Sequence, residues 1–299
     1  MDADPLYHVK QLFHQALTPA CIDEASTQPL TPGSEEPALQ RAIYVARSYL
    51  ALRPPQVDAA LNVLAPFTSL EVPPTPARAA EALAKYIQTG SEDVVENVRD
   101  IVLEVEGEDS VDEGLVRALA GTVFILAGEK EEAVATLNDG AGHDDLECLA
   151  LLTQLLLSLD RRDLAQSTFA HAKAIGNDSA LVQAIEAWIG LKTGARPLHQ
   201  AYYYYEELYQ LPGGRTPGVL AAHAAAHLLL GHEDEAKADI ADAQGQDPNN
   251  EDVLAVATAL GDNVAAAKLA NTKHPLAADL ASKSALFDEA AAKFVSASA

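Results

Sequence analysis

Residues 219–254, VLAAHAAAHLLLGHEDEAKADIADAQGQDPNNEDVL, contain two alanine-rich stretches that are separated by Gly231. Alanine and leucine have high helix propensities, and glycine is a common residue just after the end of a helix. The second stretch opens with the acidic residues at 233–235, which favour a helix N-terminus, and it is followed by Pro248, which stops a helix. The stretch therefore predicts two helices joined by a short turn, a helical hairpin.

Small residues occupy the positions of this hairpin at which two helix backbones must approach closely. The hairpin matches the tetratricopeptide pattern, a repeat of about 34 residues whose second helix ends at proline. The matching residues are Ala224, Ala236, Ile240, Ala243 and Pro248. A single hairpin of this kind cannot bury its apolar face, so neighbouring copies must stack on it. The match therefore predicts further copies along the chain.

The turn of the hairpin recurs upstream at Gly128, Asp160 and Gly194. The successive spacings between these turns, ending at Gly231, are 32, 34 and 37 residues. Weaker copies of the helix–turn–helix pattern are HQALTPACIDEA, ALRPPQVDAALNVL and IQTGSEDVVENV. The drift in spacing indicates that the repeats are degenerate. Together the copies span nearly the whole chain.

Apolar residues show no sustained alternation of the kind that a strand requires. The proline-rich inserts at 28–37 and 71–78 fall between hairpins, where proline breaks no helix. We predict an all-α fold, a curved superhelix in which residues 1–299 form a single α-solenoid of degenerate tetratricopeptide-like helical hairpins. Residues 275–299 are expected to form C-terminal capping helices, and the first helix of each hairpin is expected to line the concave face.

The charge of the chain argues against two classes of partner. The formal net charge is −24, from 44 acidic and 20 basic residues, so phosphates of nucleic acids and anionic lipids are repelled. No apolar run reaches the length that spans a bilayer, and we expect no direct membrane insertion. The two cysteines, Cys21 and Cys148, lack the spacing of a metal site and are expected to be reduced thiols of a cytoplasmic protein.

Four adjacent tyrosines stand in the segment AYYYYEELYQ at 201–210. Ala201 falls at the small position of a second helix, and Tyr205, four residues later, falls where the repeat needs a large apolar side chain. We expect Tyr205 to lie in the core and Tyr204 to be the most exposed of the four. The cluster is either aromatic packing that compensates for an irregular repeat, or a phosphotyrosine or partner site.

The order of landmarks after residue 144 is more specific than the repeat pattern. DDLECLALLTQLLLSLDRRDLAQ is followed by Trp188 in AIEAWIGLKTG, then by AYYYYEEL, and near the C-terminus by KHPLAADLASKSALFDEAAAKF. In these landmarks the chain resembles the epsilon subunits of coatomer, the COPI coat of vesicles that carry cargo from the Golgi apparatus back to the endoplasmic reticulum. The resemblance covers essentially the full length and is strongest from Asp145 to Tyr203.

The resemblance implies a non-enzymatic scaffold that holds the C-terminal region of the coatomer alpha subunit in its concave face and meets other coatomer subunits indirectly. It also implies a cytoplasmic protein that is peripheral on Golgi membranes and COPI vesicles as part of the coat, because other subunits and a small GTPase recruit that coat. An alternative function is a tetratricopeptide adaptor or co-chaperone scaffold for a different protein partner.

The segment HAAAH places His223 and His227 one helical turn apart, a spacing by which two imidazoles can share a zinc ion. Both positions normally pack against neighbouring helices in the repeat, and the glutamate of a metalloprotease motif is absent, so we expect packing rather than a metal site. Cys148 lies in a leucine-rich helix without a cationic neighbour that would activate it. We expect no catalytic residues, no enzyme activity and no cofactor.

The inner helices between 114 and 230 offer almost only Arg117 and Lys192 as basic residues, too few to hold the acidic tail that chaperone adaptors capture. Their inner faces offer apolar side chains instead. The candidate partner-binding residues are Ile125, Leu157, Leu191 and Leu228 at the twelfth repeat position, Trp188 one turn before Leu191, and Tyr204. The four residues of the column either contact a partner or pack between helices.

Overall fold

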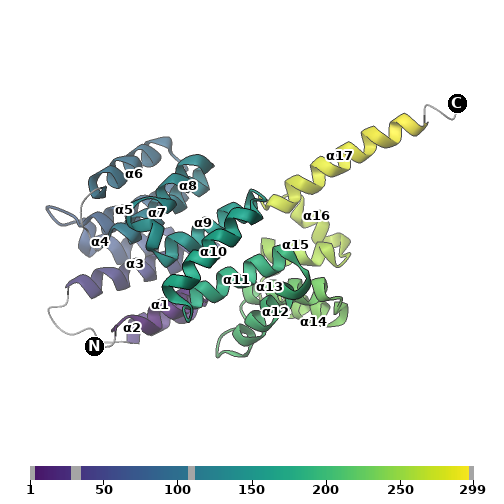
Figure 1. The fold of residues 1–299 in the computed structure, drawn as a ribbon, viewed down its shortest axis with the longest axis horizontal. Coiled ribbons are helices and arrows are strands. Elements are labelled where there is room, and N and C mark those ends of the chain that lie inside the picture. Colours follow the sequence, from purple (N-terminus) through teal and green to yellow (C-terminus); the bar gives the residue numbers. More distant parts are fainter. Residues whose placement is uncertain (1–3, 28–34, 107–111, 296–299) are drawn as a thin grey trace. The chain divides into compact units, whose positions relative to one another are not determined.

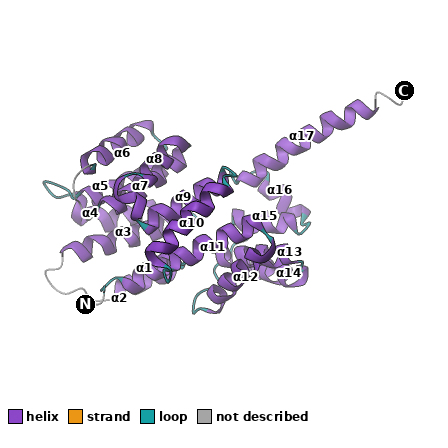
Figure 2. Ribbon diagram, in the orientation of Figure 1, coloured by secondary structure: helices purple, strands orange, loops and turns teal. Residues whose placement is uncertain are grey.

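Helices make up the regular structure of the protein. A computed structural model describes residues 4–27, 35–106 and 112–295. These residues form 17 α-helices and one short 3-10 helix, and no strand occurs among them (Figure 1). Short loops and turns connect the helices (Figure 2). The prediction of an all-α fold is confirmed.

Consecutive helices pair as hairpins along the chain. The first six pairs are α1 (Tyr7–His14) with α2 (Thr18–Thr27), α3 (Glu35–Ala51) with α4 (Val57–Thr68), α5 (Thr75–Thr89) with α6 (Glu92–Val105), α7 (Glu113–Ala127) with α8 (Lys130–Asn138), α9 (Leu146–Ser158) with α10 (Arg162–Gly176), and α11 (Ala180–Thr193) with α12 (Ala195–Gln210). The 3-10 helix η1 (Gly140–Asp144) lies between α8 and α9. Two more pairs and a last helix follow, α13 (Pro217–Leu230) with α14 (Glu233–Gln246), α15 (Glu251–Ala259) with α16 (Asn263–Leu269), and α17 (Pro275–Val295).

The chain divides into two compact units, which we call the first unit (Met1–Tyr204) and the second unit (Tyr205–Ala299). The core of the first unit includes three clusters of buried apolar side chains, which are contributed by α1 to α3, by α3 to α9 and by α7 to α11. The second unit has a core of its own, contributed by α13 to α16. The single solenoid expected over residues 1–299 stays a prediction.

Left-handed backbone conformations mark the predicted turns. The φ angle is 85° at Gly128, 83° at Gly231, 75° at Gly194 and 58° at Asp160. Glycine adopts positive φ without the steric penalty that a Cβ brings, and aspartate is one of the few other residues that tolerate it. Each of these residues follows the first helix of a hairpin, as the spacing of the repeat predicted.

Small residues allow close approach between paired helices, as the repeat pattern predicted. At Gly190 in α11, a Cβ would lie 2.5 Å from the carbonyl oxygen of Pro197 and 3.1 Å from the Cβ of Ala201 in α12. At Gly121 in α7, a Cβ would lie 2.5 Å from the Leu137 side chain of α8. A larger side chain at either position would push the two helices of a hairpin apart.

The tyrosines of α12 agree with the sequence prediction at one position and contradict it at another. Ala201 is fully buried and Tyr205 is 7% exposed, as expected for core positions. The most exposed of the four is Tyr203, at 62%, whereas Tyr204 is half-buried, so the prediction for Tyr204 is wrong. The reason is helical geometry, because Tyr203 lies about 200° around the helix from Ala201 and therefore points away from the buried face.

The chain beyond residue 275 differs from the expectation of more than one helix. Its described part is a single helix, α17, most of whose side chains are exposed. Of the two proline-rich inserts, residues 28–34 lie outside the described residues, and residues 35–37 begin α3. Residues 71–74 form a loop, but 75–78 form the first turn of α5, where a proline near the helix start leaves no backbone donor unsatisfied.

Candidate partner-binding surface

The predicted partner-binding residues of the first unit lie near the C-terminal ends of neighbouring first helices. Helix α9 packs against both α7 and α11. Leu157 of α9 is 8% exposed and belongs to the core. Ile125 of α7 and Trp188 of α11 are half-buried against the same core, and Leu191 is also half-buried. The column was expected either to contact a partner or to pack between helices. Leu157 packs between helices, whereas Ile125, Trp188 and Leu191 are partly accessible.

The remaining candidate residues are each partly accessible. Leu228 of α13 is half-buried against the core of the second unit. Tyr204 is half-buried on α12. Their role in binding a partner stays a prediction.

Two exposed leucines near the same helix ends were not predicted. Leu126 in α7 is 52% exposed, and Leu159, which follows α9, is 36% exposed. They stand one and two residues after the predicted column positions 125 and 157. Because α7, α9 and α11 are first helices of successive hairpins, their C-terminal ends lie on one side of the first unit. We call Ile125, Leu126, Leu159, Trp188 and Leu191 the helix-end surface.

The two basic residues of the inner helices, Arg117 and Lys192, differ in accessibility. Arg117 is 3% exposed, and its Nε donates to Glu113 Oε1 at 2.6 Å in the interior of the first unit. Arg117, one of the two basic residues noted in the inner helices, is therefore not available to a partner, because its charge is used within the fold. Lys192 keeps an accessible side chain, 3.6 Å from Asp160 Oδ1.

A buried ionic cluster within the first unit was also missed. Glu147, at the start of α9, forms an ion pair through Oε2 with Arg47 Nη1 of α3 at 2.6 Å, and His14 Nε2 of α1 lies 3.0 Å from its other oxygen. Tyr44 donates its hydroxyl to the oxygen that contacts His14. The cluster therefore ties α1 and α3 to α9. The sequence held no signal for it, since these residues come from different hairpins.

The partners of Glu147 decide its protonation. Burial by itself favours the neutral acid and would raise the pKa of Glu147. The charge of Arg47 and the contacts with His14 and Tyr44 outweigh burial, so the pKa of Glu147 is held well below its usual range. The same burial and the nearby Glu147 charge raise the pKa of Tyr44, which stays a neutral donor. The cluster holds a carboxylate at neutral pH.

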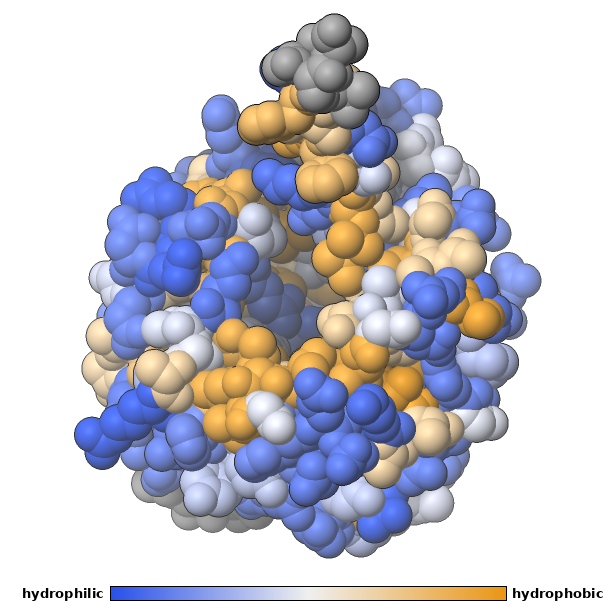
Figure 3. Space-filling view, turned by 90° about the vertical axis from the view of Figure 1, so that its right-hand side faces the viewer, coloured by the Kyte–Doolittle hydropathy of each residue, from blue (hydrophilic) through white to orange (hydrophobic). Residues whose placement is uncertain are grey.

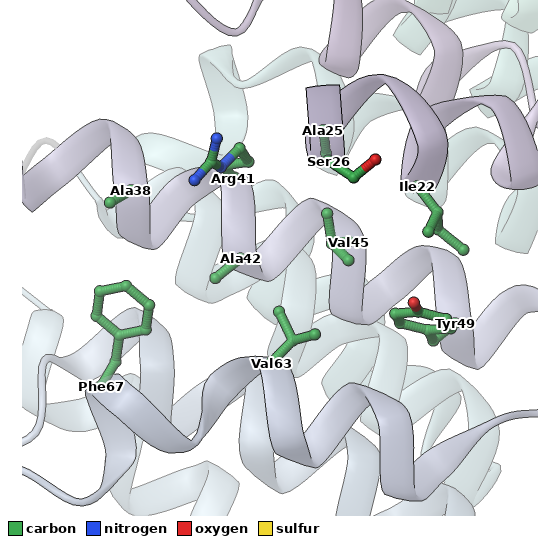
Figure 4. Close-up of a pocket in the computed structure, with 10 residues that line it drawn as sticks. All are labelled: Ile22, Ala25, Ser26, Ala38, Arg41, Ala42, Val45, Tyr49, Val63 and Phe67. Atoms are coloured by element: carbon green, nitrogen blue, oxygen red, sulfur yellow. The ribbon is translucent and has the colours of Figure 1, made fainter. Parts of the chain in front are cut away.

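An apolar pocket of about 360 Å³ lies between α2, α3 and α4 in the first unit (Figure 4). Its lining is mostly aliphatic and aromatic, and its polar groups are the Arg41 guanidinium and the hydroxyl groups of Ser26 and Tyr49. Figure 4 shows Val63 and Phe67 of α4 facing Val45 and Ala42 of α3. Sequence reasoning did not predict this pocket, because it forms from two hairpins whose repeat pattern is weak.

Helix α17 carries large apolar side chains that the fold does not cover. Leu286 is 55% exposed, Phe287 72% and Phe294 80%. Figure 3 looks at this end of the molecule and shows apolar residues, in orange, along the helix that leads to the grey C-terminal residues. Neither α17, with 21 residues, nor any other described helix is both long enough and apolar enough to cross a membrane.

Comparison with known proteins assigns the chain to a protein family. A family model described as the coatomer epsilon subunit matches residues 2–295. The chain belongs to the coatomer epsilon subunit family. Coatomer subunit epsilon-1 of Arabidopsis thaliana is 25% identical over 255 residues, which are 84% of this chain and 81% of the relative. The coatomer subunit epsilon of Dictyostelium discoideum is 28% identical over 141 residues, 47% of this chain and 46% of the relative.

A solved structure supports the architecture. A tetratricopeptide repeat protein of Parabacteroides merdae superposes with a TM-score of 0.53 at 12% sequence identity, over 81% of this chain and 97% of that one. At this identity the likeness shows the fold alone, and it confirms the predicted tetratricopeptide-like helical solenoid. Membership of the coatomer epsilon subunit family makes the chain a structural component of the COPI coat in vesicle-mediated transport, associated with other coatomer subunits.

Proposed function

We propose that this chain binds the C-terminal region of the coatomer alpha subunit, and that it thereby supports Golgi-to-endoplasmic-reticulum retrograde transport as a peripheral, non-enzymatic part of the coat. The observation that supports a protein partner is the helix-end surface, where apolar side chains of three successive first helices are accessible together. Membership of the coatomer epsilon subunit family supports the choice of a coatomer subunit as that partner.

The chemistry of the surface favours an apolar contact. Burying one leucine-sized side chain contributes about 1.5–3 kcal/mol before the costs of association, and aromatic residues are enriched at the centres of interfaces. Leu126, Leu159 and Leu191 with Trp188 are therefore sufficient to anchor one apolar segment of a partner. The core residue Leu157 supports the surface from below and does not contact the partner.

The test is affinity for a purified C-terminal region of the alpha subunit. The double substitution Leu126→Asp with Leu191→Asp places two charges in the apolar contact, and we expect affinity to fall by about 100-fold. The matched control is Leu103→Asp in α6, a second helix, where the leucine is 64% exposed. The control should bind as the unchanged protein does.

Three results would contradict the proposal at different points. An unchanged protein that fails to bind the alpha-subunit region would reject the partner. Full binding by the double variant, with its melting temperature retained, would reject the helix-end surface. Equal loss in the Leu103→Asp control would show that added negative charge alone prevents binding.

The alternative of an adaptor for acidic tails loses support from the position of Arg117. A tail of carboxylates needs accessible cations, and Arg117 is buried in its ion pair with Glu113. Lys192 alone cannot replace it, because the acidic tail carries several charges.

A further inference from the structure

Two histidines of α13 meet an acidic residue of α14 in the interior of the second unit. His223 is 3% exposed, His227 8% and Asp239 7%. One ligand atom from each of the three lies within 4.8 Å of the other two. Asp239 lies outside the HAAAH segment, on the other helix of the hairpin. The hairpin thus supplies a buried set of two imidazoles and one carboxylate.

Both ring nitrogens of His223 face carboxylate oxygens. Nδ1 lies 2.9 Å from Asp239 Oδ2, and Nε2 lies 3.0 Å from Glu206 Oε2 at the end of α12. A neutral imidazole has one N–H, so it can donate to only one of these two oxygens. The other contact brings a nitrogen lone pair against a carboxylate, which is favourable only if a cation lies between them or the ring is doubly protonated.

A divalent cation satisfies this arrangement more completely than a second proton does. With neutral imidazoles, Glu206 and Asp239 bring two negative charges to the cluster, and one divalent ion balances both. A proton on His223 would engage that ring alone, whereas a metal ion also engages His227, whose ring centroid is 4.4 Å from that of His223. Two histidines and a carboxylate are ligands that zinc accepts.

The neighbours of the two histidines resemble the outer sphere of a metal site. A ligating histidine usually donates its second N–H to a carboxylate, which fixes the ring. Glu206 stands in that place for Nε2 of His223, and Tyr209 stacks on the His223 ring with centroids 5.1 Å apart. His227 Nδ1 lies 3.3 Å from Nδ1 of the exposed His232. Glu206 and His232 border solvent, so an ion has a short route inward.

We propose that His223, His227 and Asp239 bind one divalent transition-metal ion of the zinc class, with Glu206 as the outer-sphere residue that orients His223. Ligand atoms around a tetrahedral zinc ion with bonds of about 2.0–2.1 Å lie about 3.4 Å apart, so small side-chain rotations bring the three ligands to one ion. A fourth position remains for water. The site is structural, because the ion joins the end of α12 to both helices of the α13–α14 hairpin.

The test uses the full chain after treatment with a chelator. Titration with Zn²⁺ should give one ion per chain and raise the melting temperature, and Co²⁺ should give the visible absorption of a four-coordinate ion. His227→Gln and Asp239→Asn keep side-chain size and remove a ligand, so each should weaken Zn²⁺ affinity by about 100-fold or more, and Glu206→Gln by about 10- to 100-fold. Glu206 is partly accessible, so Glu206→Gln should stay folded even if the substitutions at the buried His227 and Asp239 disturb folding.

The matched control is His171→Gln. His171, His143 and Asp144 form the other three-residue group of this kind among the described residues, but His143 and Asp144 are exposed and His171 is only half-buried. The control should leave the affinity unchanged. The proposal is overturned if the unchanged protein takes up no stoichiometric Zn²⁺. It is equally overturned if the ligand variants retain full affinity, or if His171→Gln loses it.

Discussion

The carboxylate of Glu147 lies 2.6 Å from the guanidinium of Arg47, and both side chains are nearly buried, at 12% and 11% exposure. Glu147 opens α9, whereas Arg47 belongs to α3, so the pair joins hairpins that are not neighbours in the sequence. The Arg47 guanidinium also lies over the Phe13 ring of α1, 4.4 Å from its centroid. In a stack of repeats, where most contacts are between neighbouring hairpins, such a contact links distant parts of the first unit.

Removal of Arg47 should therefore destabilise the first unit strongly. Arg47→Ala leaves the buried carboxylate of Glu147 without its main charge partner, which costs about 3–5 kcal/mol. The control is Arg78→Ala, because the Arg78–Glu104 pair is largely exposed and such pairs contribute about 0–1 kcal/mol. Unfolding in urea, followed by circular dichroism, measures both. Equal, small losses would show that the buried pair contributes no more than a surface pair.

Acid should weaken the same contact. The pKa of Glu147 is lower in the folded chain than in the unfolded chain, so its stabilising contribution is complete above the unfolded value of about 4.3 and is lost as the pH falls toward the folded value. Glu147→Gln removes this titration. The difference in unfolding free energy between the unchanged protein and the variant should shrink as the pH is lowered from 7 to 3. A difference that stays constant with pH would contradict the assigned ion pair.

The tyrosines of α12 should differ sharply in their effect on stability. Tyr205→Ala empties a core position and should cost about 3–5 kcal/mol, as truncation of a buried aromatic side chain does. Tyr203→Ala removes a ring that is 62% exposed and should change stability by less than about 0.5 kcal/mol. Thermal melts of the two variants compare them directly. A large loss in Tyr203→Ala would mean that its ring is covered in solution.

The repeat pattern predicted features that depend on local geometry. Positive φ at Gly128 and Gly231 and burial of Ala201 follow from the spacing between a helix end and the small residue of the next helix. The exposure of Tyr203 rather than Tyr204 also follows from local geometry, because Tyr203 lies about 200° around the helix from the buried Ala201 and Tyr204 only about 60° from it.

Other features depend on which hairpins meet, and one sequence does not contain that information. The Glu147–Arg47 pair needs the first turn of α9 to lie within reach of α3, and the His223–Asp239 contact needs the facing positions of two helices in register. Charge counts along the sequence could not separate the buried Arg117 from an accessible cation either. Isolated Glu, Arg and His residues are common on helix surfaces, so their types alone gave no signal.

A single methyl group should distinguish a close contact between helices from an open helix position. In Gly190→Ala the new Cβ would lie 2.5 Å from the Pro197 carbonyl oxygen, which is backbone and cannot turn away, so α11 and α12 must separate. We expect the free energy of unfolding to fall by about 1–3 kcal/mol, as for other overpacked sites.

Gly245→Ala is the matched control, because Gly245 lies within α14 and a Cβ there meets no atom within 4 Å. Alanine favours helix over glycine, so this control should gain about 0.5–1 kcal/mol. Urea unfolding should therefore give changes of opposite sign, and a gain in both variants would show that the α11–α12 contact is loose enough to accept a side chain.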